Sequence, residues 1–129
     1  MGTGLACSSA LAAATFASRS KVVAGLTTDP LVREAIVAVF PLVMLCQVLK
    51  GLAYPVNGVL MGGLDWTAAS VTMWASNLAC LAVLLRDTPV SLAKLWTGFA
   101  ALFLCQCGAG LLRVVSGTGP WKRLRVKRE

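Results

Sequence analysis

The sequence predicts an all-α integral membrane protein, a partial helical bundle with three to four transmembrane helices. Hydrophobic residues make up 57% of the 129 residues and charged residues only 13%, whereas a soluble domain carries about 25% charged residues. Two uncharged runs, 66–85 and 95–112, are long enough to cross the ~30 Å hydrocarbon core of a bilayer as helices. Composition and run length therefore favour a membrane protein over a soluble one.

The stretch between Glu34 and Asp65 predicts one long, kinked helix. It carries a single charge, at Lys50 near its middle. A straight helix of this length would reach ~45 Å, which is longer than the hydrocarbon core is thick. Pro41 and Pro55 lie inside the stretch, and a proline inside a helix removes a backbone hydrogen bond and kinks it.

The N-terminal run 1–18 has no charge and predicts a weaker, alanine-rich helix. A targeting peptide within 1–28 is the alternative, but a secretory signal would place positive charge before the apolar run. Segment 20–33 is expected to be a polar connector. The membrane domain, 1–121, is therefore expected to hold helices near 4–18, 31–61, 66–86 and 91–115.

Turn and cap residues are expected to set the ends of these helices. Asp29 and Pro30 fit an N-cap followed by the first helical position. A glycine turn at 62–63 permits positive φ, Asp65 is expected to cap the helix that follows it, and Ser91 the last one. The turn 86–89 separates those two helices.

The charge of +7 is concentrated at the C-terminus, where the segment 122–129 holds five of the twelve basic residues. Such a flank predicts a cytosolic basic tail under the positive-inside rule, and not a nucleic-acid interface, which would be a basic face on a folded domain. The five cysteines form no Cys-x-x-Cys pair. We therefore expect no metal site, no cofactor, no disulfide framework and no enzymatic chemistry.

Polar residues within the apolar runs are the candidates for a transport cavity. Lys50 is the most costly of them, at ~3 kcal/mol on insertion scales for the bilayer centre. It shares a helix face with the residues three before and seven after it, and that face should look into a bundle or cavity. The alternative is that Lys50 snorkels or pairs only for packing. The candidate set is Gln47, Lys50, Asn57, Asn77 and Gln106.

Two further patterns bear on function. All five acidic residues lie at run ends or in turns, so the apolar runs lack the embedded carboxylate that a proton-coupled pump usually needs. Gly58 and Gly62 form a small-xxx-small pattern, and Gly108 and Gly110 offer a second thin surface, which are features typical of helix packing in membranes.

Three blocks, in order, resemble the C-terminal part of the multidrug and toxic compound extrusion (MATE) transporters, in the plant and algal branch related to DinF-like members. They are Leu26-Thr27-Thr28-Asp29; Gln47 through Asn57-Gly58-Val59 to Gly62-Gly63-Leu64-Asp65; and Arg113 with Gly117-Thr118-Gly119-Pro120-Trp121. The resemblance implies a fragment of a multi-pass antiporter that exports organic solutes against H⁺ or Na⁺. Such a fragment would be inactive alone and would need the missing N-terminal lobe or self-association as its partner.

Two departures from the family pattern put ion coupling through this lobe in question. Lys50 stands where relatives often have asparagine, and Asn57 where they often have aspartate. A small self-assembling four-helix multidrug transporter and a non-transporting membrane module are the alternatives. The lipid bilayer is the expected environment, and branch resemblance makes the plastid envelope one candidate membrane.

Overall fold

The computed structural model describes residues 2–86, 89 and 91–122, and within these the chain is helical with no strand. The helices are α1 (Gly2–Ala17), α2 (Arg19–Leu26), α3 (Pro30–Gly62), α4 (Trp66–Leu85) and α5 (Leu92–Ser116), followed by the short 3₁₀ helix η1 (Gly119–Trp121). The all-α fold class predicted from composition is confirmed. Most of the basic tail, 123–129, and much of the turn 86–89 lie outside the described residues.

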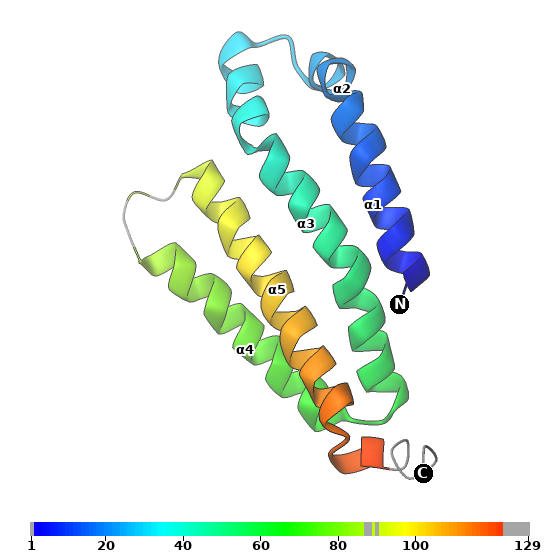
Figure 1. Ribbon diagram of the computed structural model, residues 1–129. Coiled ribbons are helices and arrows are strands. Elements are labelled where there is room, and N and C mark those ends of the chain that lie inside the picture. The colour runs from blue at the N-terminus through cyan, green and yellow to red at the C-terminus, as the bar shows by residue number, and fades with distance from the viewer. Residues whose placement is uncertain (1, 87–88, 90, 123–129) are drawn as a thin grey trace.

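Three helices, α3, α4 and α5, are long and apolar enough to cross a membrane. Helix α1 is apolar but has 16 residues, which corresponds to ~24 Å and falls short of the hydrocarbon core. Helix α3 has 33 residues and contains both Pro41 and Pro55. Figure 1 shows α3 changing direction between its cyan start and its green remainder.

The segment 20–33 was expected to be a polar connector, and this prediction is wrong for its first half. Helix α2 occupies Arg19–Leu26, because backbone hydrogen bonds from Ser18 to Ala14 and from Val22 to Ser18 carry the helical pattern through the polar stretch. The connector is reduced to Thr27–Asp29. There Asp29 caps α3 by accepting from the backbone of Leu31 at 2.8 Å, as predicted.

The long helices pack in the spatial order α1, α3, α5, α4 (Figure 1). Gly4 of α1 lies against Gly51 and Pro55 of α3, while Phe16 lies against Phe40, so α1 and α3 are antiparallel. Helices α3 and α5 are parallel. Cys46 donates to the carbonyl of Trp96 at 3.6 Å near one end of that contact, and Val56 meets Gly110 farther along.

The packing is typical of a membrane bundle, because small and polar residues share the interior with a few large apolar ones while many large apolar residues lie outside. Ala53 and Ser76 are fully buried, whereas the side chains of Trp74 and Leu112 are about 70% exposed. Lipid tails are as apolar as leucine, so such side chains need no protein cover. The thin surface predicted at Gly58 and Gly62 is not used within the described chain, since a Cβ at either would meet open space.

Candidate functional site

Lys50, the charge at the middle of α3, leans toward α5. Its Nζ lies 5.6 Å from the centroid of the Phe103 ring, within the range of a cation–π interaction. Both Lys50 and Gln47 are partly buried, and Phe103 belongs to the buried core between α3 and α5. The charge is therefore held against a protein ring on one side.

Asn57 of α3 and Gln106 of α5 are the two deeply buried members of the candidate set, each only 9% exposed. Asn57 Oδ1 and Gln106 Oε1 have no hydrogen-bond partner among the described residues. A buried acceptor left unpaired costs about 1–3 kcal/mol. Asn57 and Gln106 therefore place two unpaired amide oxygens inside the described part of the bundle, on the adjoining helices α3 and α5.

Asn77 is not brought to the other candidates. It lies exposed on α4, and its Nδ2 donates to the carbonyl of Met73 in its own helix at 2.9 Å. The hollows described below are lined by other residues. The role of these residues in a transport cavity stays a prediction, and Asn77 is the member of the set that lies on the exposed surface of the bundle.

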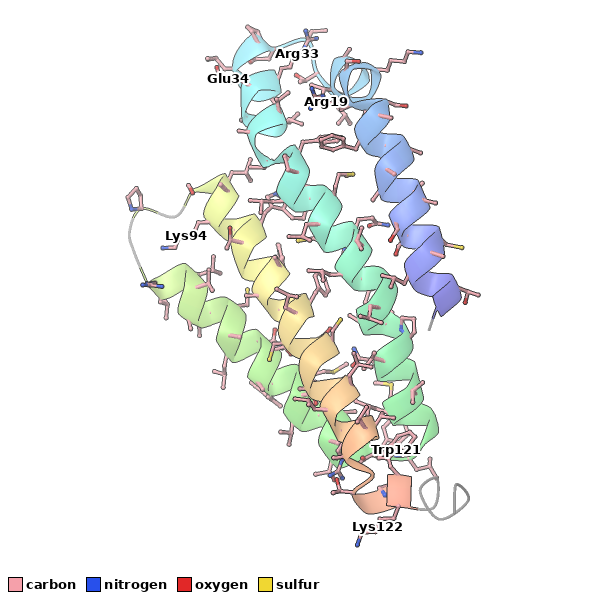
Figure 2. All side chains as sticks on the ribbon, in the orientation of Figure 1. Arg19, Arg33, Glu34, Lys94, Trp121 and Lys122 are labelled. Atoms are coloured by element: carbon pink, nitrogen blue, oxygen red, sulfur yellow. The ribbon has the colours of Figure 1, made fainter. Side chains whose placement is uncertain are left out.

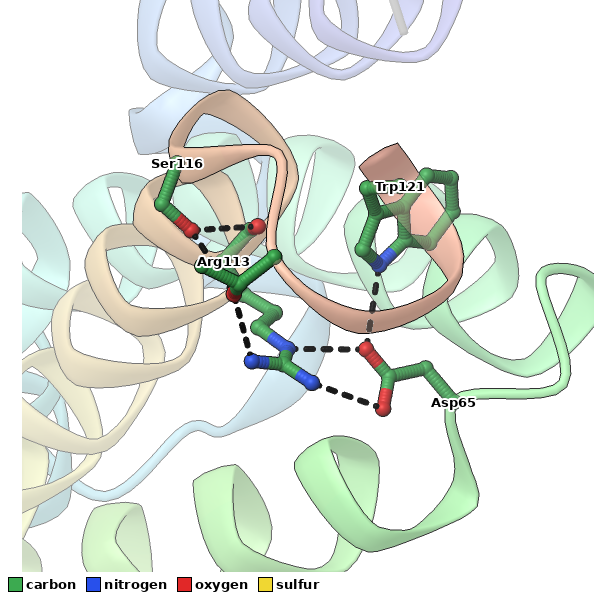
Figure 3. A network of polar contacts seen from close by, with 5 residues as sticks. Asp65, Arg113, Ser116 and Trp121 are labelled. Atoms are coloured by element: carbon green, nitrogen blue, oxygen red, sulfur yellow. Dashed lines mark hydrogen bonds and ion pairs between the residues drawn. The ribbon is translucent and has the colours of Figure 1, made fainter. Parts of the chain in front are cut away.

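A polar network at the tail end of the bundle joins the α3–α4 turn to the end of α5 (Figure 3). Arg113 donates to both carboxylate oxygens of Asp65, from Nε at 2.8 Å and from Nη2 at 3.3 Å. The Trp121 indole donates to the same carboxylate at 3.0 Å. Arg113 also donates from Nη1 to Thr118 Oγ1 at 2.6 Å. We call Asp65, Arg113, Thr118 and Trp121 the carboxylate clamp.

The clamp corrects one sequence prediction. Asp65 occupies the N-cap position of α4, as expected, but its side chain makes no cap hydrogen bond there. The carboxylate is turned toward Arg113 and Trp121, because a guanidinium that donates to both carboxylate oxygens adds a full opposite charge to the hydrogen bonds. Ser91, by contrast, does cap α5 by accepting from the backbone of Lys94 at 3.2 Å.

The electrostatics of the clamp favour the ionised form of Asp65. The hydrogen bonds from Arg113 hold the pKa of this carboxyl below its ordinary value, while burial acts in the opposite direction, and the Trp121 indole adds to the lowering. Because the lowering causes dominate, the clamp is closed with a charged carboxylate at neutral pH.

Backbone geometry brings the clamp residues together. Leu64 adopts the positive φ of the α3–α4 turn, at 56°, although the glycine turn at 62–63 was expected to supply it. Gly117 ends α5 in the left-handed conformation at φ 60°, which reverses the chain and returns Trp121 to the turn. There the indole packs against Leu60 and Ala69 in a small buried cluster.

Gly63 is needed for a different reason, which is close contact with the clamp. A Cβ at this position would lie 2.5 Å from Cη2 of Trp121. We therefore expect Gly63→Ala to displace the indole from Asp65 and destabilise the protein by about 1–3 kcal/mol, as overpacking usually does. The measurement is thermal unfolding in detergent followed by circular dichroism.

Gly62→Ala is the matched control for this substitution, because a Cβ at Gly62 meets nothing within 4 Å. The control should be neutral or slightly stabilising. If both variants unfold at the temperature of the parent chain, the close packing of Trp121 on Gly63 is not present in the folded protein.

Comparison with known proteins finds two plant relatives. The chain is 32% identical over 101 residues to Protein DETOXIFICATION 42 of Arabidopsis thaliana, a match that covers 77% of this chain and 19% of the relative. It is 30% identical over 122 residues to Protein DETOXIFICATION 44, chloroplastic, of the same plant, covering 94% of this chain and 23% of the relative. The chain thus spans about a fifth of the length of each of these relatives.

No family model matches the chain, and no solved structure does. The two relatives support a relation to the same transporter family that the three sequence blocks resemble.

Proposed function

We propose that this chain belongs to the MATE transporters, in the plant and algal branch related to DinF-like members, and forms part of the C-terminal lobe. The match to two DETOXIFICATION proteins supports the family, and the helical bundle supports a lobe of a multi-pass carrier. On this proposal the complete protein is an antiporter that exports organic solutes against H⁺ or Na⁺.

The observation that carries the proposal is the carboxylate clamp. Asp65 belongs to the second of the three sequence blocks, and Arg113 and Trp121 belong to the third. Residues 48 and 56 positions apart meet in one network. The second and third sequence blocks, which resemble the same family, are therefore in contact in the folded chain. If the resemblance of each block were a matter of chance, there would be no reason to expect this contact.

The chain's contribution to transport would be a wall of the solute pathway. Lys50, Asn57 and Gln106 supply one positive charge and two amide oxygens without partners in the described chain. None of these three side chains is a carboxylate that could take up a proton from water. A coupling carboxylate, if coupling uses one, would therefore come from another part of the transporter.

This role predicts that position 50 is reached by water in the assembled carrier. The test uses a chimera in which this chain replaces the matching segment of DETOXIFICATION 44. All native cysteines of the chimera are changed to serine. A cysteine at Lys50 should react readily with a small water-soluble thiol reagent. Cysteines at Val71, which is exposed on α4, and at Leu102 should react less, because lipid or packing covers them.

Equal protection at all three positions would contradict the pathway role and favour the alternative that Lys50 serves packing alone. The labelled fraction, read by mass shift, reports this directly. Export of an organic dye by the same chimera shows that the labelled protein is an active carrier.

The second candidate function is a small transporter that assembles from copies of this chain. Exposed Gly58 and Gly62 favour it, since they form a thin helix face against which another helix can pack closely. Against it, the described part of α1 is short for a full span. Flux of an organic cation into liposomes that hold this chain alone separates the two candidates.

A further inference from the structure

A hollow of about 280 Å³ lies where α1, α2 and α3 meet, at the end of the bundle opposite Trp121 and Lys122 (Figure 2). Two arginines, Arg19 and Arg33, line this hollow, and most of its remaining wall is apolar. The lining residues are Phe16, Arg19, Ser20, Val23, Arg33, Val37, Phe40 and Pro41. A site that is mostly apolar with a few converging charges is the usual form of a ligand pocket.

Each guanidinium group is held in place by a contact with an uncharged partner. Arg19 lies over the Phe16 ring, 5.3 Å from its centroid, and Arg33 donates from Nη2 to the carbonyl of Thr27 at 3.2 Å. The ion pair formed among the described residues is that of Arg113 with Asp65, at the other end of the bundle. Two carboxylates lie at the same end as the arginines: Asp29 accepts from the first backbone N–H groups of α3, and Glu34 is exposed.

A second, shallow hollow, of about 430 Å³, lies beside the first between α1 and α3, and Phe16 lines both. Its wall is almost wholly apolar or small, with Ala12, Ala13 and Ala17 from α1 and Met44, Leu45 and Val48 from α3. The hollow with the two arginines thus has a shallow apolar groove as its neighbour along α1 and α3.

We propose that this site binds one anionic membrane lipid. Its phosphate would lie between Arg19 and Arg33, where the spanning helices end and lipid headgroups begin. One acyl chain would follow the groove along α1 and α3. The charge pattern selects against zwitterionic lipid because a second, positive headgroup charge would face the two guanidinium groups.

The test is native mass spectrometry of the full 129-residue chain in detergent, titrated with phosphatidylglycerol or phosphatidylcholine. The parent chain should bind phosphatidylglycerol the more tightly. The double substitution Arg19→Gln and Arg33→Gln should weaken that binding about thirtyfold, given that each of the two basic groups near a membrane surface contributes about 1 kcal/mol. Lys21→Gln is the matched control, since Lys21 is exposed on α2 but lines neither hollow, and it should leave binding near that of the parent.

A second pair of variants tests the groove. Ala13→Trp should fill it and weaken binding of phosphatidylglycerol, whereas Ala14→Trp, at an exposed position outside the groove, should not. Equal binding of the two lipids, or an equal loss from Lys21→Gln, would overturn the site. Displacement of bound lipid by inorganic phosphate, together with unchanged binding in Ala13→Trp, would overturn the acyl-chain groove. These readouts measure lipid and not flux, so they stand or fall independently of the proposed transport function.

Discussion

Replacing Asp65 with alanine is expected to open the tail end of the bundle and to lower the stability of the protein by about 2 kcal/mol, the typical contribution of a hydrogen bond to a charged group. The Asp65 side chain is only 5% exposed, and its removal leaves the Trp121 indole without its acceptor and the Arg113 guanidinium without its carboxylate partner. In thermal unfolding this corresponds to a drop of about 7 °C.

Two variants make the expectation specific to the clamp. Asp65→Asn keeps an acceptor for the Trp121 indole but loses the charge that binds Arg113, so its unfolding midpoint should lie between those of Asp65→Ala and the parent. Glu34→Ala removes an exposed carboxylate at the opposite end and should change the midpoint little. If Asp65→Ala and Glu34→Ala unfold alike, the clamp does not hold the tail end together.

The clamp should also fail in acid. Because Arg113 holds the pKa of Asp65 below its ordinary value, the stabilisation is fully present above the pKa of the unfolded chain, about 3.9. It is lost as the pH falls through the lower folded pKa. Unfolding midpoints of the parent and Asp65→Ala should therefore differ most at neutral pH and converge at low pH.

The helices that can cross a membrane were predictable because hydropathy and run length determine them without knowledge of packing. The caps at Asp29 and Ser91 were predictable for the same reason, since a cap is a contact within a few residues of sequence. Helix α2 was missed because its polar residues carry no apolar periodicity. Its helical form comes from backbone bonds continuing out of α1.

The clamp was only half predictable. Its residues were recognised as parts of family-like blocks, but nothing local pairs Asp65 with a residue 48 positions away. An aspartate that caps a helix and one that forms an ion pair look the same in sequence. Which of the two forms depends on the donors that the tertiary fold places near the carboxylate. The positive φ of Leu64 was unpredictable in the same way, because the preference of glycine for that conformation pointed to its neighbour.

The candidate pathway residues show the same division. Their depth within apolar runs followed from the sequence, and Asn57 and Gln106 are indeed buried. The exposure of Asn77 depends on which face of α4 meets α5, and the weak amphipathicity of a membrane helix does not reveal this. Lys50 meets Phe103 of another helix, a contact that no pattern within α3 predicts.

On the proposed function, this chain is part of one lobe of a two-lobe antiporter. Alternating access in secondary transporters requires two repeats or bundles that move against each other around a site at their interface. The described chain supplies three helices long enough to span a membrane and one shorter apolar helix, and leaves two buried amide oxygens without partners. We therefore expect the 129 residues to carry no solute by themselves.

The decisive measurement is flux of a fluorescent organic cation into liposomes that hold the purified 129-residue chain, under an imposed pH or Na⁺ gradient. The chimera with DETOXIFICATION 44 and empty liposomes serve as the two references. We expect the chain alone to give no flux above empty liposomes, while the chimera gives flux that depends on the gradient. Gradient-dependent flux through the chain alone would contradict the assignment to one lobe and would make a self-assembling small transporter the correct description.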